Sequence, residues 1–86
     1  MSTSNISGRQ LKAARALLGW SQTDLARIAD ASRPTVERIE SVGNGAIDYV
    51  RHDKAGAVIE ALRGAGIDFV NGDRIGVTLR KAKRRR

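Results

Sequence analysis

Apolar positions recur at helical spacing in four segments of the chain. The first is the clearest, because residues three and four apart fall on one face of a helix. Leu11, Ala14, Leu17 and Leu18 predict a helix from about Gly8 to Leu18. The same reasoning predicts further helices over about Gln22–Ala29, Arg33–Ser41 and Asp53–Arg63.

Residues typical of helix ends bracket the first two of these segments. Ser7 and Gln10 have the spacing of a capping box, in which each side chain satisfies an unpaired amide of the other residue. Gly19 stands where a helix commonly ends in a left-handed residue. Ser21 is a good cap for the second helix, with Asp24 three residues on, beside the positive end of the helix dipole. Both helices therefore have well-defined starts.

The connection between the second and third helices is only about four residues long, Ala29 to Ser32. So short a turn requires a small contact between steeply crossing helices, with Ala26 and Ala29 facing Val36 and Ile39. Asp30 falls where the backbone needs a left-handed residue, which Asp tolerates better than most side chains. Ser32 caps the third helix, and Pro34 lies in its first turn, where a missing amide proton costs nothing.

Near the C-terminus, the spacing of apolar residues changes from helical to alternating. Residues 42–45 contain Gly-Asn-Gly and predict a loop, and Gly64 is expected to end the fourth helix. Beyond it, apolar residues alternate with polar ones on both sides of Asn71-Gly72, a strong turn sequence. The sequence therefore predicts a mainly α fold of about four helices that ends in a β-hairpin over residues 67–80.

Composition limits the remaining possibilities. A chain of 86 residues with 41% hydrophobic residues suits one compact domain, here 7–80, between a short flexible start (1–6) and a basic tail (81–86). The polar first residues lack the apolar core of a signal peptide, no stretch is long enough to span a membrane, and there is no cysteine. We expect a cytoplasmic protein.

The net charge of +7 is concentrated at the C-terminus. Residues 80–86 hold six of the 16 Lys and Arg residues, which leaves ten against nine Asp and Glu, or +1, for residues 1–79. The tail therefore suggests a nearby polyanion such as nucleic acid, without indicating sequence recognition.

The segment SQTDLARIADASRPTVERIE resembles the helix-turn-helix of the Cro and phage-repressor (lambda-repressor-like) family. Gln22, Ala26, Val36, Ile39 and Glu40 match that pattern, and the likeness extends over about residues 7–42. There are two departures: Asp30 stands where the family usually has Gly, and a hairpin replaces the helices that usually end the domain.

The resemblance, together with the predicted exposure of the third helix, indicates which residues contact DNA. The third helix would lie in the major groove, with positions 33, 34 and 38 at base edges and positions 32 and 35 nearer the backbone. Gln22, in similar proteins, both binds phosphate and braces the recognition helix. The full set of expected DNA-binding residues is Gln22, Thr23, Ser32, Arg33, Pro34, Thr35, Glu37, Arg38 and Asn44, with nonspecific phosphate contacts from Lys81, Lys83, Arg84, Arg85 and Arg86.

Other charged and aromatic residues favour structural roles. Arg15 and Glu40 resemble the family's buried ion pair between the first and third helices. His52 is the only histidine, and the scattered aspartates at 48, 53, 68 and 73 lack the spacing of a calcium loop. Trp20 and Tyr49 are interpreted as core residues or as members of a hydrophobic staple at a helix start. We therefore expect no catalytic or metal site, no cofactor and no small-molecule effector.

The leading hypothesis is a transcriptional regulator, a repressor or dual regulator. It would be similar to Cro or to the controller proteins of mobile elements, and autoregulatory as that likeness implies. It would act as a homodimer on half-sites about one helical turn apart. Ile75, Val77 and Leu79, with the fourth helix, are the expected interface, because a lone hairpin leaves open strand edges. The alternatives are an antitoxin-like or other protein-binding module with secondary DNA binding, and an architectural factor dominated by its tail.

Overall fold

The computed structural model describes residues 6–43, 47 and 53–81 of the chain. Its elements follow one another as four helices and two strands: α1 (Gly8–Leu18), α2 (Gln22–Ala29), α3 (Arg33–Glu40), α4 (Ala55–Gly64), β1 (Ile67–Val70) and β2 (Gly76–Leu79). The predicted fold class is confirmed. None of the helices in this part of the chain has the length and apolar character needed to cross a membrane.

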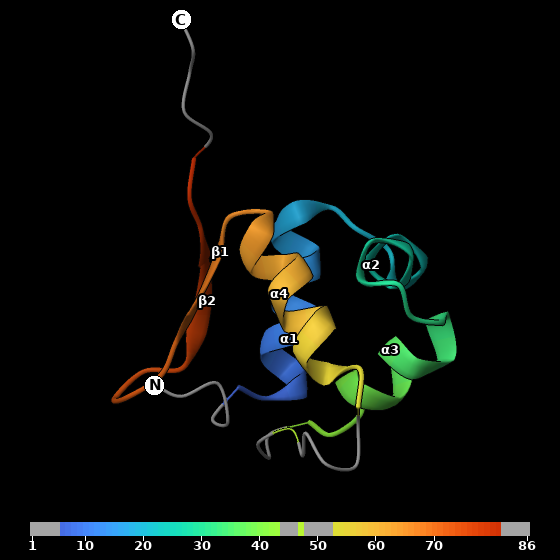
Figure 1. Cartoon of the computed structure of the whole chain (residues 1–86). Coiled ribbons are helices and arrows are strands. Elements are labelled where there is room, and N and C mark those ends of the chain that lie inside the picture. Colours follow the sequence, from blue (N-terminus) through green and yellow to red (C-terminus); the bar gives the residue numbers. More distant parts are fainter. Residues whose placement is uncertain (1–5, 44–46, 48–52, 82–86) are drawn as a thin grey trace, which may run out of the picture.

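The elements form three layers (Figure 1). The hairpin β1–β2 packs on α1 and α4, and α2 and α3 lie on the other side of these two helices. The strands pair antiparallel, with Ile67 opposite Leu79 and Phe69 opposite Val77. These four side chains share one face of the sheet, because cross-strand partners point to the same side. Ile67 is fully buried, and Phe69 and Val77 pack against the core, so this face is the one that meets the helices.

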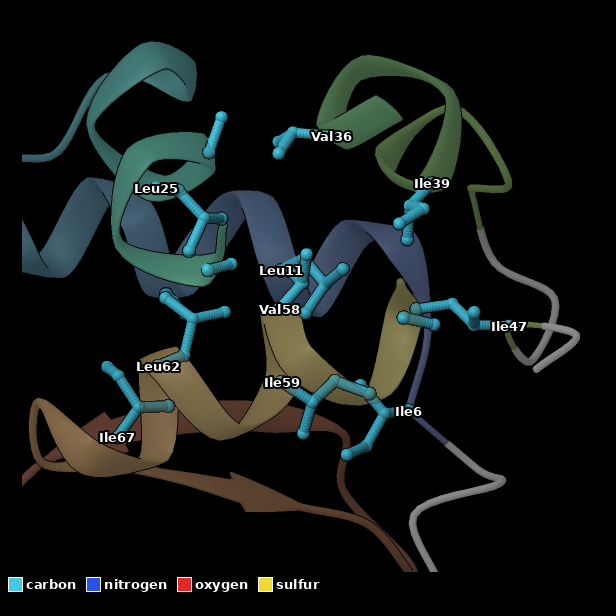
Figure 2. Close-up of a cluster of buried hydrophobic side chains, with 14 residues drawn as sticks. Ile6, Leu11, Leu25, Val36, Ile39, Ile47, Val58, Ile59, Leu62 and Ile67 are labelled. Carbon is cyan, nitrogen blue, oxygen red and sulfur yellow. The ribbon is translucent and has the colours of Figure 1, made fainter. Parts of the chain in front are cut away.

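The core lies where the four helices and the inner face of the hairpin converge. Figure 2 shows Leu11, Leu25, Val36, Ile39 and Leu62 pointing into this common space. Ile6 and Ile47 complete it, at 1% and 3% exposed, and the Ile47 amide donates to the Ile6 carbonyl at 3.0 Å. Ile6 is therefore a core residue and does not belong to a flexible start.

The predicted helix ends are confirmed in detail. Both hydrogen bonds of the capping box between Ser7 and Gln10 are present, and Ser21 and Asp24 form a second capping box. Gly19 has φ 72° and Asp30 has φ 57°, both in the left-handed region. Ser32 caps α3 by accepting a hydrogen bond from the Thr35 amide. The local sequence thus determines where each of the first three helices begins.

Some boundaries differ from expectation. α4 begins at Ala55 rather than Asp53, and α3 ends at Glu40 rather than Ser41. Gly64 is the last helical residue of α4, and the left-handed residue that follows is Gly66, with φ 108°. β2 begins at Gly76, so Ile75 precedes the strand and is 71% exposed.

The hairpin is attached to α1 by a buried amide. Gln10 is 3% exposed, and its Nε2 donates to the carbonyls of Val70 (3.1 Å) and Gly76 (2.9 Å), the last paired residues of the two strands. Its Oε1 meanwhile accepts from the Ser7 amide at 3.0 Å. One side chain therefore caps α1 and also fixes the position of the hairpin.

Candidate nucleic-acid interface

The start of α2 presents polar groups to solvent. Ser21 and Asp24 satisfy each other's amides at 2.9 and 3.0 Å, while the amides of Gln22 and Thr23, in the first turn, have no intrahelical acceptor. The pKa of Asp24 is lowered, first by its hydrogen bond from the Ser21 amide and then by Arg27. This carboxylate therefore stays ionised at the start of α2.

The turn between α2 and α3 sets the angle at which α3 projects. Leu25, Ala26 and Ala29 of α2 are buried, as are Val36 and Ile39 of α3. The left-handed Asp30 reverses the chain between them, and the Ala31 amide closes the turn by donating to the Ala26 carbonyl at 2.8 Å. The small contact predicted for this crossing is thus present.

The opposite face of α3 is open to solvent. Arg33, Pro34, Glu37 and Arg38 are all exposed, and Thr35 is half-buried. Arg33 and Glu37 approach to 3.7 Å, with both side chains about half exposed, so this ion pair contributes little energy. Arg38 has no charged partner among the described residues. The exposed face of α3 therefore presents hydrogen-bond donors and acceptors along its whole length.

The two hydroxyls at the start of α3 bond each other. Ser32 Oγ and Thr35 Oγ1 are 2.8 Å apart, and Ser32 Oγ also accepts from the Thr35 amide at 3.2 Å. Both residues lie at the exposed N-terminal end of the helix, where the dipole is positive. These hydrogen bonds hold the first turn of α3 together.

A buried carboxylate holds α3 against α1 and α2. Glu40 is 1% exposed, and its two oxygens accept from Arg15 Nε (2.6 Å), Arg15 Nη2 (3.0 Å) and Gln22 Nε2 (3.0 Å). Arg15 Nη1 also donates to the Trp20 carbonyl, at the entry to α2. The hydrogen bonds that Arg15 donates to Glu40 raise the pKa of Arg15. The pair between Arg15 and Glu40 is confirmed, as is the bracing role expected of Gln22.

The end of α3 rests on a glycine that the sequence analysis treated only as a helix start. A Cβ on Gly8 would stand 2.8 Å from the carbonyl carbon of Glu40 and 2.9 Å from the carbonyl oxygen of Ile39. Only glycine fits this approach without a shift of the backbone. The clue in the sequence was a residue of poor helix propensity in the first turn of an otherwise well-capped helix.

Of the expected contacts in the loop after α3 and in the basic tail, the structure describes only Lys81. Lys81 is exposed and follows β2, on the hairpin side of the molecule. Asn44, Lys83 and Arg84–Arg86 lie outside the described residues, as do His52, Asp48 and Tyr49. Within the described residues, no three His, Asp or Glu side chains gather in a group that could hold a metal ion.

A comparison with known families agrees with this geometry. Residues 11–41, just over a third of the chain, match the family model described as helix-turn-helix. The match runs from α1 through the end of α3 and includes the Arg15, Gln22 and Glu40 network.

Residues 11–41 form a helix-turn-helix of the Cro and phage-repressor type. This match supports a DNA-binding regulator whose partner is double-stranded DNA, and proteins with this helix-turn-helix are generally not enzymes. No curated protein matches the chain closely enough to count as a relative. The helix-turn-helix is joined on its α1 side to α4 and the hairpin, which the family match does not cover.

Proposed function

We propose that this protein is a sequence-specific transcriptional repressor that binds paired half-sites as a homodimer and regulates its own synthesis. The observation that carries the proposal is the combination of a braced α3 and its exposed face. Glu40 fixes the helix through three hydrogen bonds, while Arg33 and Arg38 stay in solvent. A rigid helix with free polar side chains suits base reading, since its side chains are positioned before DNA arrives.

Each exposed residue has a role suited to its chemistry. Arg33 and Arg38 pair with the two acceptors of guanine, Pro34 contacts a thymine methyl group, and Glu37 accepts from cytosine. Gln22, Thr23, Ser32 and Thr35 bond phosphates beside the groove, where a helix start attracts anions. Asn44 and the basic tail residues Lys81, Lys83 and Arg84–Arg86 add phosphate contacts without sequence preference.

A dimer follows from the amount of information that one helix reads. A single recognition helix contacts about four or five base pairs, too few for the roughly 10³–10⁷ preference over random DNA of specific binders. Two copies on half-sites in successive turns double the contacts. Repression follows if such a site overlaps a promoter, and autoregulation follows if the promoter is the protein's own.

Selection of bound sequences from a random DNA pool tests the proposal. We expect a paired half-site motif from the natural protein. Arg33→Ala and Arg38→Ala should each weaken binding to that motif by about 5- to 150-fold, the value of one bidentate contact to guanine, and relax selection at one position. Arg74→Ala removes the same charge from the exposed hairpin loop and is the matched control, expected to keep the motif.

Two results would contradict the proposal. Enrichment of no sequence would leave only nonspecific binding, as expected for an architectural factor. Loss of all binding on removal of residues 81–86 would assign the affinity to the tail, whereas we expect weaker binding, a shallower salt dependence and an unchanged motif.

A further inference from the structure

The inner face of the hairpin is left open at one end. Leu79 lies opposite Ile67 on this face, yet it is 38% exposed while Ile67 is fully buried. The two helices that pack on the hairpin end here, α1 at Leu18 and α4 at Gly64, and residues 64–66 are Gly-Ala-Gly, with almost no side chain to fill the space. The result is a hollow of about 720 Å³, lined by Leu18, Gly64, Ala65, Gly66, Leu79, Arg80 and Lys81.

The floor of this hollow favours an apolar group. Leu18 packs against the core and leaves part of its surface in the hollow, and its neighbour Leu17 is 48% exposed. The amides of three lining residues already have acceptors: Ala65 donates to the Leu62 carbonyl (3.1 Å), Gly66 to the Arg63 carbonyl (3.0 Å) and Arg80 to the Gly66 carbonyl (2.8 Å). A volume of this size is typical of sites that receive a ligand. An occupant therefore gains chiefly by burying apolar surface against the leucines.

The rim of the hollow is basic. Arg80 and Lys81 are both exposed, and no acidic residue is among those that line the hollow. Arg80 Nη1 is paired with Asp68 at 3.1 Å, but Lys81 has no charged partner within the described residues. Four of the next five residues in the sequence are also Lys or Arg. Positive charge concentrated at one edge attracts an anionic partner.

The combination of an apolar floor and a basic rim decides between two kinds of anionic partner. DNA presents phosphates along its surface, and they would gain nothing from Leu18 and Leu79. A protein segment that carries Asp or Glu beside a large apolar side chain satisfies both parts of the site at once. The hollow therefore matches an acidic protein segment better than nucleic acid.

We propose that this hollow binds an acidic segment of a partner protein. A leucine or aromatic side chain of the segment fills the space beside Leu18 and Leu79, and its carboxylates pair with Lys81 and the basic residues that follow it. Those tail residues would then exchange phosphate for carboxylate when the partner binds. α3 lies on the far side of α1 and α4 from the hairpin (Figure 1), so the partner leaves the recognition face free. The regulator would thus carry a second protein to the DNA site that α3 selects.

Selection from a peptide library tests the site without DNA, so the outcome does not depend on the function proposed above. Random peptides of about 12 residues, displayed on phage, are selected on the immobilised natural protein. We expect enriched peptides to combine a large apolar residue with several Asp or Glu residues. Fluorescence anisotropy of a labelled synthetic peptide then gives its affinity. Replacing its apolar residue with Ser should weaken binding by about 10- to 100-fold, and raising the salt from about 50 to 500 mM should weaken it further.

Gly64→Leu blocks the hollow in the protein itself. A Cβ at Gly64 meets nothing within 4 Å, so the new side chain has room to occupy the space that the peptide needs. We expect at least about a tenfold loss of peptide affinity. Gly56→Leu is the matched control, because it makes the same exchange in the same helix, also with nothing within 4 Å, at a residue that does not line the hollow. Circular dichroism checks that both variants are folded.

Charge reversal at the rim gives a second readout. Lys81→Glu should weaken binding of the acidic peptide by about fivefold, because an attractive exposed charge becomes repulsive. Arg74→Glu makes a similar reversal at an exposed position in the hairpin loop, at the other end of the strands, and should change the affinity by less than about twofold.

Three results would overturn the proposal. Enrichment of acidic peptides without a large apolar residue would make the tail a simple polyanion site. Equal affinities of Gly64→Leu and Gly56→Leu would place the peptide elsewhere. Enrichment of no peptide would remove the partner, and a loss of self-association in Gly64→Leu would then assign the hollow to a second copy of the chain. None of these results bears on whether α3 selects a DNA sequence, which the DNA selection decides separately.

Discussion

Replacing Arg15 should destabilise the fold far more than replacing a surface arginine, because it leaves the Glu40 carboxylate buried with one hydrogen-bond donor. Glu40 is 1% exposed and receives three hydrogen bonds, two of them from Arg15. Breaking a buried ion pair by removing one partner costs about 3–5 kcal/mol. The Arg15 side chain is 19% exposed, so water relieves part of this, and we expect about 3 kcal/mol for Arg15→Met.

That loss is a large fraction of the total free energy of unfolding. A chain of 86 residues is typically stable by about 4–13 kcal/mol. Urea unfolding at pH 7 measures the difference, followed by circular dichroism and by the fluorescence of Trp20, the single tryptophan. Arg74→Ala, an exposed hairpin-loop arginine, should change stability by less than about 0.5 kcal/mol.

The double variant Arg15→Met/Glu40→Met makes the reasoning refutable. Apolar residues in place of both partners remove the charge that has to be kept out of water, so the double variant should be more stable than Arg15→Met alone. A cost below about 1 kcal/mol for Arg15→Met would show that the carboxylate does not depend on Arg15. A double variant as unstable as the sum of the two single variants would show that the residues act independently.

Four further predictions concern single positions. Gly8→Ala should destabilise the protein by about 1–3 kcal/mol in urea unfolding, because the new Cβ meets the backbone of residues 39 and 40. Gly56→Ala is the control: a Cβ there meets nothing within 4 Å and should stabilise by about 0.5–1 kcal/mol. Equal effects of the two substitutions would refute the contact at Gly8. Gln10→Leu removes the two hydrogen bonds to the hairpin and should lower the free energy of unfolding by about 2 kcal/mol. Amide hydrogen exchange should become faster in residues 67–79 than in α2 and α3. An equal loss of exchange protection in all elements would contradict a local effect of Gln10 on the hairpin. Asp30→Gly should stabilise by about 0.5–1 kcal/mol because φ is 57° there, and Asp30→Ala, which keeps a Cβ, should not. Folding lowers the pKa of Asp24 from 3.8, so its contribution to stability is present above that pH and is lost as the pH falls through the lower folded value. Between pH 7 and pH 2.5, the free energy of unfolding should therefore fall more steeply for the natural protein than for Asp24→Asn. Parallel curves would exclude the capping carboxylate as the cause.

Hydrogen bonds to near neighbours made the first half of the fold predictable. The capping boxes at Ser7 and Ser21, the left-handed Asp30 and the turn before Ser32 all depend on atoms within a few residues of each other. The family resemblance supplied the pairing of Arg15 with Glu40, which spacing alone would not have identified. The exposed face of α3 followed from the burial of Val36 and Ile39 on its other side.

The sequence by itself therefore determined the helices, their ends, the hairpin and the helix-turn-helix, because each depends on local bonding or on a periodic apolar face. Only the tertiary structure decided that Gln10 reaches carbonyls 60 and 66 residues away, that Gly8 supports the end of α3, and that Ile6 and Ile47 pair in the core. These contacts depend on how the helices cross and where the hairpin docks, and that packing geometry is absent from any short stretch of the chain.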